Sequence, residues 1–265
     1  MNPNSFSFKP QFPILNSQGN GKRTSTIPEG DDGSNFKKNV KISRILLLIC
    51  TIVVVIFIIS FSMVYSISDF LVILGLSMLF IGPTYIANAM MVFTSDGRPI
   101  DGGRNFIDGK RLFGRTKTIG GFIGGLIFGF LFGLLFGYLF YWNFPAIQKF
   151  AETQLNLLKF VDLLYLEKFL HPPVYLIPIR AFFCGLGSPL GDLTGSFLKR
   201  RFSIGSGKPF WLVDQLDFVV ITIILSFAWF PFNVYNIILL LIITPSIALY
   251  ANTVAYGVGK KKEPW

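Results

Sequence analysis

Histidine and cysteine are almost absent from this sequence. Its 265 residues include one histidine, His171, and two cysteines, Cys50 and Cys184, which both lie inside apolar stretches. The lone histidine excludes a histidine-based catalytic triad and a histidine metal cluster, and the cysteines lack the spacing of a zinc site or a disulfide framework. Any chemistry must therefore rely on carboxylates, on lysine and arginine, and on a bound metal ion.

Charge is also scarce. Only 14% of the residues are charged, 52% are hydrophobic, and the mean hydropathy is +0.57, which indicates a polytopic membrane protein rather than a soluble domain. The formal net charge is nevertheless +10. In a membrane protein an excess of lysine and arginine is first a signal of topology, and without a soluble basic domain we expect no nucleic-acid partner. The sequence contains no GxxxxGKS or GxxxxGKT motif, which excludes a P-loop fold.

Long apolar runs define the organisation of the chain. Residues 1–40 are rich in Ser, Asn, Gly, Pro and Lys and show no apolar periodicity, which predicts a disordered cytoplasmic tail. Residues 41–66 are predicted to form an extra N-terminal transmembrane helix, and residues 67–265 a membrane-embedded domain. We expect an all-α polytopic membrane protein with about six spans, near residues 45–65, 70–93, 119–142, 174–190, 218–230 and 235–258.

The positive charges are distributed unevenly around these runs. Twenty lysines and arginines fall in the N-terminal tail, in polar loops near 94–118 and 199–208, and at the C-terminus, whereas three fall on the other side, Lys149, Lys159 and Lys168. The last cation, Arg180, lies within the fourth run and is expected to face protein or a water-filled cavity. Because basic residues stay on the cytoplasmic side, we predict that both termini and both polar loops are cytoplasmic.

The segment GDLTGSFLKRRFSIGSGKPFWLVDQLDF, residues 191–218, concentrates charges of both signs between two apolar runs. Helical spacing places on one face Asp192, Ser196 and either Lys199 or Arg200. Asp214 and Asp217 stand three residues apart, so they too would share a face.

These aspartates predict a metal site. A charged group at a membrane helix costs roughly 3 kcal/mol unless it is paired or bound to metal. Three aspartates beside the basic run 199–201 therefore predict Mg²⁺ and a polyphosphate, because carboxylates hold Mg²⁺ and cations hold phosphate oxygens. The alternative is a solvated cytoplasmic loop whose basic residues serve topology alone.

The earlier polar loop, residues 94–118, also combines aspartates, cations and glycines. Backbone amides could approach an anion closely at its glycines, Gly102, Gly103, Gly109 and Gly114. Asn88 precedes the loop and follows a kink expected at Gly82-Pro83; it could form an interhelical hydrogen bond or a polar wall of the site. Two such loops at one membrane face fit phosphoryl or nucleotidyl transfer, in which metal and cations neutralise phosphate charge.

Glycine recurs at every fourth residue in the run 119–142, at Gly121, Gly125, Gly129, Gly133 and Gly137. Such a ridge of small residues allows close helix packing. The partner of the ridge is either another helix of the chain or a second copy of the chain in a homodimer.

GDLTGSFLKRR followed by DQLDF resembles the CDP-archaeol synthases and, more distantly, the phosphatidate cytidylyltransferases. PIDGGRNFIDGKRLFGRTKT in the first polar loop, Ala87-Asn88-Ala89 and residues 252–265 also resemble that family, and the likeness extends over about residues 70–265. The resemblance implies transfer of a cytidylyl group from CTP to the archaeal ether lipid 2,3-bis-O-geranylgeranylglycerol 1-phosphate. It also implies Mg²⁺ as cofactor, release of pyrophosphate, and an archaeal plasma membrane.

The resemblance further implies roles for individual residues. Asp192, Asp214 and Asp217 would hold the metal and, with Lys199, act in catalysis. The substrates would be bound by Asn88, Asp101, Lys110, Arg111, Lys117, Thr118, Ser196, Arg200 and Arg201. The chain departs from the family pattern at Ile119-Gly120, where a Trp-Arg pair is usual, and at Ala248, where a histidine is expected. Both departures concern contacts with phosphate and lipid.

Two other functions stay open. A CTP-using polyprenol kinase would share the nucleotide loops but phosphorylate an alcohol. A non-catalytic lipid-phosphate transporter would be expected to show an internal repeat or paired broken helices. The sequence has no convincing repeat, although prolines interrupt its second and fourth apolar runs.

Overall fold

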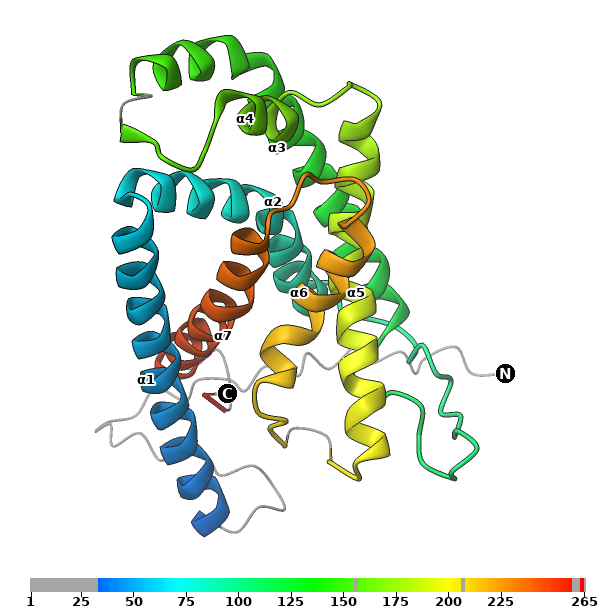
Figure 1. The fold of residues 1–265 in the computed structure, drawn as a ribbon. Coiled ribbons are helices and arrows are strands. Elements are labelled where there is room, and N and C mark those ends of the chain that lie inside the picture. Colours follow the sequence, from blue (N-terminus) through cyan, green and yellow to red (C-terminus); the bar gives the residue numbers. More distant parts are fainter. Residues whose placement is uncertain (1–32, 155–156, 206–207, 259–262, 265) are drawn as a thin grey trace, which may run out of the picture.

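The computed structural model describes residues 33–154, 157–205, 208–258 and 263–264. Within these residues every regular element is an α-helix, apart from isolated β-bridges, which confirms the all-α fold class. The helices are α1 (Gly33–Val64), α2 (Ile67–Phe93), α3 (Ile119–Thr153), α4 (Leu163–Leu170), α5 (Leu176–Arg201), α6 (Val213–Ser226) and α7 (Val234–Gly257) (Figure 1). Residues 33–40, which we expected in a disordered tail, are helical; the rest of that tail lies outside the described residues.

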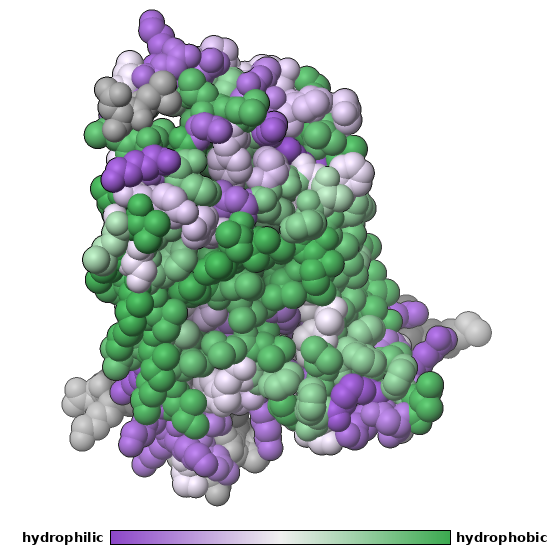
Figure 2. All heavy atoms as spheres, viewed as in Figure 1, coloured by the Kyte–Doolittle hydropathy of each residue, from purple (hydrophilic) through white to green (hydrophobic). Residues whose placement is uncertain are grey.

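In the part of the chain that the structure describes, four helices are long and apolar enough to cross a membrane, namely α1, α2, α3 and α7. On the face shown in Figure 2, hydrophobic residues form a belt around the middle of the molecule, and hydrophilic residues gather at both ends. A belt of this kind matches the hydrocarbon core of a bilayer. The chain is therefore a multi-pass membrane protein.

The fourth and fifth expected spans, 174–190 and 218–230, fall on α5 and α6, which are not among those four helices. α5 ends in three basic residues, so its apolar part is short. α6 has 14 residues, which is about 21 Å of helix and less than the ~30 Å hydrocarbon core. Length and composition thus support four spans, and the number six stays a prediction.

The glycine ridge of α3 packs against α5 within the chain. A Cβ atom at Gly129 would lie 2.6 Å from the Cα atom of Gly185, and one at Gly133 would lie 2.8 Å from the Cα atom of Ala181. Only glycine permits such an approach between helices. The paired numbers rise along α3 and fall along α5, so the two helices run antiparallel. The ridge therefore serves a contact within the chain, and a homodimer stays a prediction.

A second glycine ridge joins α5 to α6. Three glycines of α5 lie so close to α6 that no side chain would fit at their positions. The pairs are Gly187 with Thr222, Gly191 with Phe218, and Gly195 with Asp217. These helices are also antiparallel, because the numbers again run in opposite directions. This packing brings the first turns of α6 beside the second half of α5. Asp217 of α6 is thereby brought against Gly195, one helical turn beyond Asp192 on α5.

α2 bends in the middle, as the sequence predicted. The helix changes direction along its length (Figure 1), and Pro83 lies inside it. Proline lacks an N–H, and its ring clashes with the carbonyl four residues earlier, so it kinks a helix. The hydroxyl of Thr84 donates a hydrogen bond of 2.9 Å to the carbonyl of Cys184 in α5, which fixes the bend against its neighbour.

α1 lies on the outside of the helix assembly. It contacts α7 near both of its ends, where the Tyr65 and Tyr235 hydroxyls are 2.8 Å apart and Phe36 packs on Tyr256. Large apolar side chains such as Leu48, 61% exposed, point away from the protein. Exposed apolar surface on a long helix is suited to lipid.

Candidate functional site

The polar loop 94–118 is folded around Asp101. The buried carboxylate accepts hydrogen bonds from Arg111 Nε (2.8 Å) and Nη2 (2.7 Å), and from the backbone N–H groups of Gly103 (2.9 Å) and Phe113 (3.2 Å). The Arg111 guanidinium holds the pKa of the Asp101 carboxyl well below its usual range, because it stabilises the ionised form. Asp101 and Arg111, expected to bind substrate, are thus engaged in holding the loop together.

Arg201, the last residue of α5, attaches the loop 94–118 to that helix. It donates to Asp108 Oδ1 at 2.5 Å and to the Arg111 carbonyl at 2.7 Å. Its guanidinium carbon lies 4.9 Å and 4.8 Å from the ring centres of Phe106 and Phe197. A cation held between two rings and a carboxylate is a strong anchor, so Arg201 contacts protein on several sides.

Lys110 and Arg200 complete the attachment. The Lys110 ammonium donates to the Arg201 carbonyl (2.9 Å) and to the Ser203 hydroxyl (2.7 Å). Arg200 Nε donates to the Phe113 carbonyl at 2.7 Å. Lys110, Arg200 and Arg201 therefore come together where the first loop meets the end of α5, mainly through hydrogen bonds to backbone carbonyls.

Two of the three candidate metal ligands are paired with lysines. Lys117 Nζ lies 2.5 Å from Asp192 Oδ1, and Lys199 Nζ lies 2.7 Å from Asp214 Oδ2. The described residues contain no group of three or more His, Cys, Asp or Glu side chains placed to hold a metal. The three-aspartate metal centre therefore stays a prediction, and lysines pair with two of its carboxylates in this structure.

Asp217 stands in a different environment. It is partly buried against Gly195, accepts a hydrogen bond from the Phe218 N–H at 2.7 Å, and forms no ion pair with another described residue. Burial raises the pKa of this carboxyl well above its usual range, and the negative charges of Asp192 and Asp214 act in the same direction. A carboxylate short of positive charge, with two more nearby, fits a hard divalent cation such as Mg²⁺.

A cavity of about 260 Å³ opens where the end of α2, the start of α3 and the middle of α5 meet. Four of the expected site residues line it, Asn88, Lys117, Thr118 and Asp192. Asn88 thus lies on the wall of the cavity. This position favours its role as a polar wall of the site over an interhelical hydrogen bond. The Thr118 hydroxyl accepts a hydrogen bond from the Gly121 N–H at 3.1 Å and so caps α3.

Ser196 and the other two aspartates lie beside this cavity rather than on its lining. Ser196 is buried one helical turn beyond Asp192 on α5. Sequence reasoning missed the glycines of α5, Gly187, Gly191 and Gly195, which determine how near Asp217 comes to that helix. Their spacing of four residues, the same signal as in α3, could have revealed them.

The chain is similar to proteins of one known family. The model of the CarS-like family, CDP-archaeol synthase, matches residues 69–265. The CDP-archaeol synthase of Methanococcus maripaludis is 35% identical over 199 residues, which are 74% of this chain and 99% of that protein. The enzymes of the same name from Methanospirillum hungatei and Thermococcus kodakarensis are each 36% identical, over 69% and 70% of this chain and 99% and 93% of theirs.

One solved structure is also similar. It is described as "Structural insight into an intramembrane enzyme for archaeal membrane lipids biosynthesis", and it is 26% identical, with a TM-score of 0.47, over 68% of this chain and 92% of its own. The family match covers the loop 94–118, the aspartates and α7. The chain therefore belongs to the CDP-archaeol synthase family.

Proposed function

We propose that this protein transfers a cytidylyl group from CTP to 2,3-bis-O-geranylgeranylglycerol 1-phosphate, forming unsaturated CDP-archaeol and pyrophosphate in archaeal phospholipid biosynthesis. Relatives that share 35% to 36% identity over about 70% of the chain are CDP-archaeol synthases. The observation that carries the proposal is the Lys117–Asp192 pair in the cavity wall, with Asp217 close behind it. A cation that could bind phosphate and a carboxylate on the cavity wall, with a second carboxylate near them, support this proposal.

The reaction needs no nucleophile from the protein. An oxygen of the lipid phosphate attacks the α-phosphorus of CTP, the bond from that phosphorus to the bridging oxygen breaks, and pyrophosphate leaves with the electron pair. A phosphate monoester has a second pKa near 6 and is largely ionised at neutral pH. This explains how a chain whose one histidine, His171, stacks on Tyr141 could carry out the reaction without a histidine.

The protein's contribution is charge and position. We assign Lys117 and Lys199 to the phosphates of CTP, since both ammonium groups already contact carboxylates beside the cavity. Asn88, Thr118 and Ser196 are assigned to substrate binding by their place on or near the cavity wall. We assign a structural role, holding the loop 94–118 against the end of α5, to Asp101, Lys110, Arg111, Arg200 and Arg201.

Asp192, Asp214 and Asp217 would hold Mg²⁺. Bound Mg²⁺ would neutralise charge that develops on the phosphate oxygens. The lysine partners of Asp192 and Asp214 would then be available to phosphate, because a divalent cation supplies the positive charge those carboxylates now receive from lysine.

We further propose that six helices enter the membrane and that both termini face the cytoplasm of an archaeal cell. The start of α1, the loop 94–118 and the end of α5 lie toward one end of the molecule (Figure 1), and that end carries most of the basic residues. Basic residues mark the cytoplasmic side. CTP would then reach the cavity from the cytoplasm, and the lipid from the bilayer.

The deciding experiment is incubation of purified protein with α-labelled CTP, Mg²⁺ and the geranylgeranylated glycerol phosphate. We expect a labelled lipid and equimolar pyrophosphate. Transfer of the γ-phosphate to a polyprenol, with CDP as by-product, would show a kinase instead. Movement of the lipid phosphate across proteoliposomes without consumption of CTP would show a transporter.

A further inference from the structure

A buried arginine lies near the start of α5, away from the aspartates. Arg180 stands twelve positions before Asp192 on the same helix, which is about 18 Å along its axis. The residue is 8% exposed. Its guanidinium carbon is 4.5 Å from the ring centre of Phe230, and it donates hydrogen bonds to the carbonyls of Trp229 (2.7 Å), Phe169 (3.0 Å) and Lys168 (3.2 Å).

No ion pair joins Arg180 to any residue that the structure describes. A guanidinium has five N–H groups, and three hydrogen bonds to neutral carbonyls leave part of its donor capacity for another acceptor. A buried cation without a counter-ion is costly, so an anion at this position would be stabilised.

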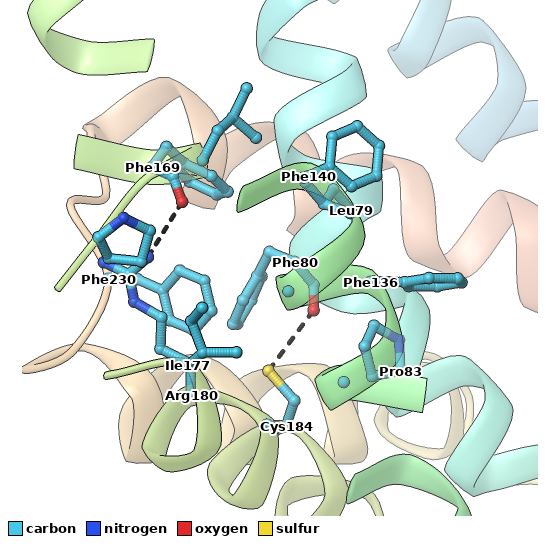
Figure 3. Close-up of a pocket in the computed structure, with 15 residues that line it drawn as sticks. Leu79, Phe80, Pro83, Phe136, Phe140, Phe169, Ile177, Arg180, Cys184 and Phe230 are labelled. Atoms are coloured by element: carbon cyan, nitrogen blue, oxygen red, sulfur yellow. Dashed lines mark hydrogen bonds between the residues drawn. The ribbon is translucent and has the colours of Figure 1, made fainter. Parts of the chain in front are cut away.

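Arg180 lines two adjoining cavities. The first, about 50 Å³, has apolar walls formed by side chains such as Leu79, Phe136, Phe140 and Ile177 (Figure 3). The second, about 450 Å³, is more open and is lined by polar side chains, Glu167, Lys168 and His171, as well as by Trp229. Arg180, Pro172 and Phe230 belong to both. The small apolar cavity, called the apolar slot below, and the larger outer cavity therefore meet at the guanidinium of Arg180.

We propose that these cavities bind an anionic phospholipid, with its phosphate at Arg180 and Lys168 and part of one hydrocarbon chain in the apolar slot. Two cations face a single carboxylate, Glu167, in the outer cavity, so the site favours a negative ligand. Its apolar half gives free phosphate nothing to contact, whereas a chain would displace water from aromatic walls. The site lies away from the aspartates and depends on no part of the proposed reaction.

Thermal unfolding of the delipidated protein in detergent tests the charge requirement. Phosphatidylglycerol should raise the unfolding temperature more than phosphatidylcholine at the same mole fraction. Lys168→Gln should lose most of that difference. Lys149→Gln should keep it, because Lys149 is an exposed lysine of α3 that lines neither cavity. Arg180→Met should abolish it, and if that variant does not fold, Lys168→Gln carries the test.

A phosphatidylglycerol with a diazirine in its chain tests the position. Cross-links should map to peptides that contain Leu79 and residues 136–140, and they should weaken in Lys168→Gln but not in Lys149→Gln. Equal stabilisation by inorganic phosphate would reduce the site to an anion site and overturn the proposal. Equal stabilisation by phosphatidylcholine, or cross-links confined to the exposed face of α1, would overturn it as well.

Discussion

The ammonium group of Lys117 lies 2.5 Å from a carboxylate oxygen of Asp192. The contact joins the residue before the N-cap of α3 to the middle of α5, across 75 positions of sequence. Because both residues also line the cavity, a ligand that enters it meets a positive and a negative group side by side. The pairing accounts for how one pocket could accept both a polyphosphate and a metal ion.

The first prediction concerns the proposed metal site. Asp217→Asn keeps the size of the side chain but removes the charge that would hold Mg²⁺, so turnover should fall by a few orders of magnitude, about 10²–10³-fold. The unfolding temperature should change little. Asp96→Asn is the matched control, because Asp96 is exposed in the first loop. Full activity of Asp217→Asn across a Mg²⁺ titration would refute the metal assignment.

The second prediction concerns the attachment of the loop to α5. Arg201→Ala removes an ion pair with Asp108 and the contacts with two aromatic rings, and it should lower the free energy of unfolding by about 2 kcal/mol. Arg104→Ala, at an exposed position in the same loop, should cost much less. Chemical denaturation in detergent followed by circular dichroism measures both. Equal stability of the two variants would show that the contacts of Arg201 between the loop and α5 do not stabilise the protein.

Stability in acid should depend on Asp101. Its pKa is lowered in the folded protein by Arg111, so its ionised form contributes stability above the unfolded-state pKa of about 3.9. That contribution is lost as the pH falls below this value toward the folded pKa. Asp101→Asn should therefore unfold at a lower temperature than the wild type near neutral pH, and the gap should narrow below about pH 4. A gap independent of pH would contradict this explanation.

Helix packing gives the fourth prediction. Gly129→Ala adds a Cβ atom 2.6 Å from the Gly185 backbone, which forces α3 and α5 apart, and overpacking of this kind costs about 1–3 kcal/mol. Gly75→Ala is the control, because a Cβ atom there has no neighbour within 4 Å. That variant should be neutral or slightly more stable, since alanine favours a helix. Unfolding temperatures in one detergent compare the two.

The fifth prediction concerns topology. A cysteine at Thr153 should react with an impermeant maleimide added to intact cells, and a cysteine at Asn105 should react only after permeabilisation. Both natural cysteines, Cys50 and Cys184, are free and buried, so background labelling should be low. The reverse pattern would place the polar loops outside the cell and exclude access of cytoplasmic CTP to the cavity.

Hydropathy and spacing predicted much of the fold. The apolar runs became helices, the kink at Pro83 is present, and Arg180 faces protein and a cavity, as expected for a cation in an apolar run. The partner of the α3 glycines could not be read from the sequence, because a ridge of small residues fits a neighbouring helix and a second copy equally well. The bounds of α6 also differ from the expected run 218–230, since the helix begins at Val213 and ends at Ser226 while the apolar run continues beyond it.

The roles within the candidate site were harder to predict. Lysine and arginine bind phosphate oxygens and carboxylate oxygens by the same hydrogen bonds, so spacing alone could not separate Lys117, in the cavity wall, from Arg201, in the loop attachment. The partners of Arg201 lie about ninety residues earlier in the chain. Such pairs become visible only when the two loops are placed against each other.

The fastening of the loop 94–118 has a consequence for the thermodynamics of nucleotide binding. Since Asp101, Lys110 and Arg201 already order the loop, little conformational entropy would be lost when CTP enters. The heat-capacity change on binding should then be small, close to that of burying the nucleotide alone, without the large negative value of a segment that folds around its ligand. The binding site would be preorganised before CTP enters. A variant that loosens the loop should therefore bind CTP with a larger entropic penalty.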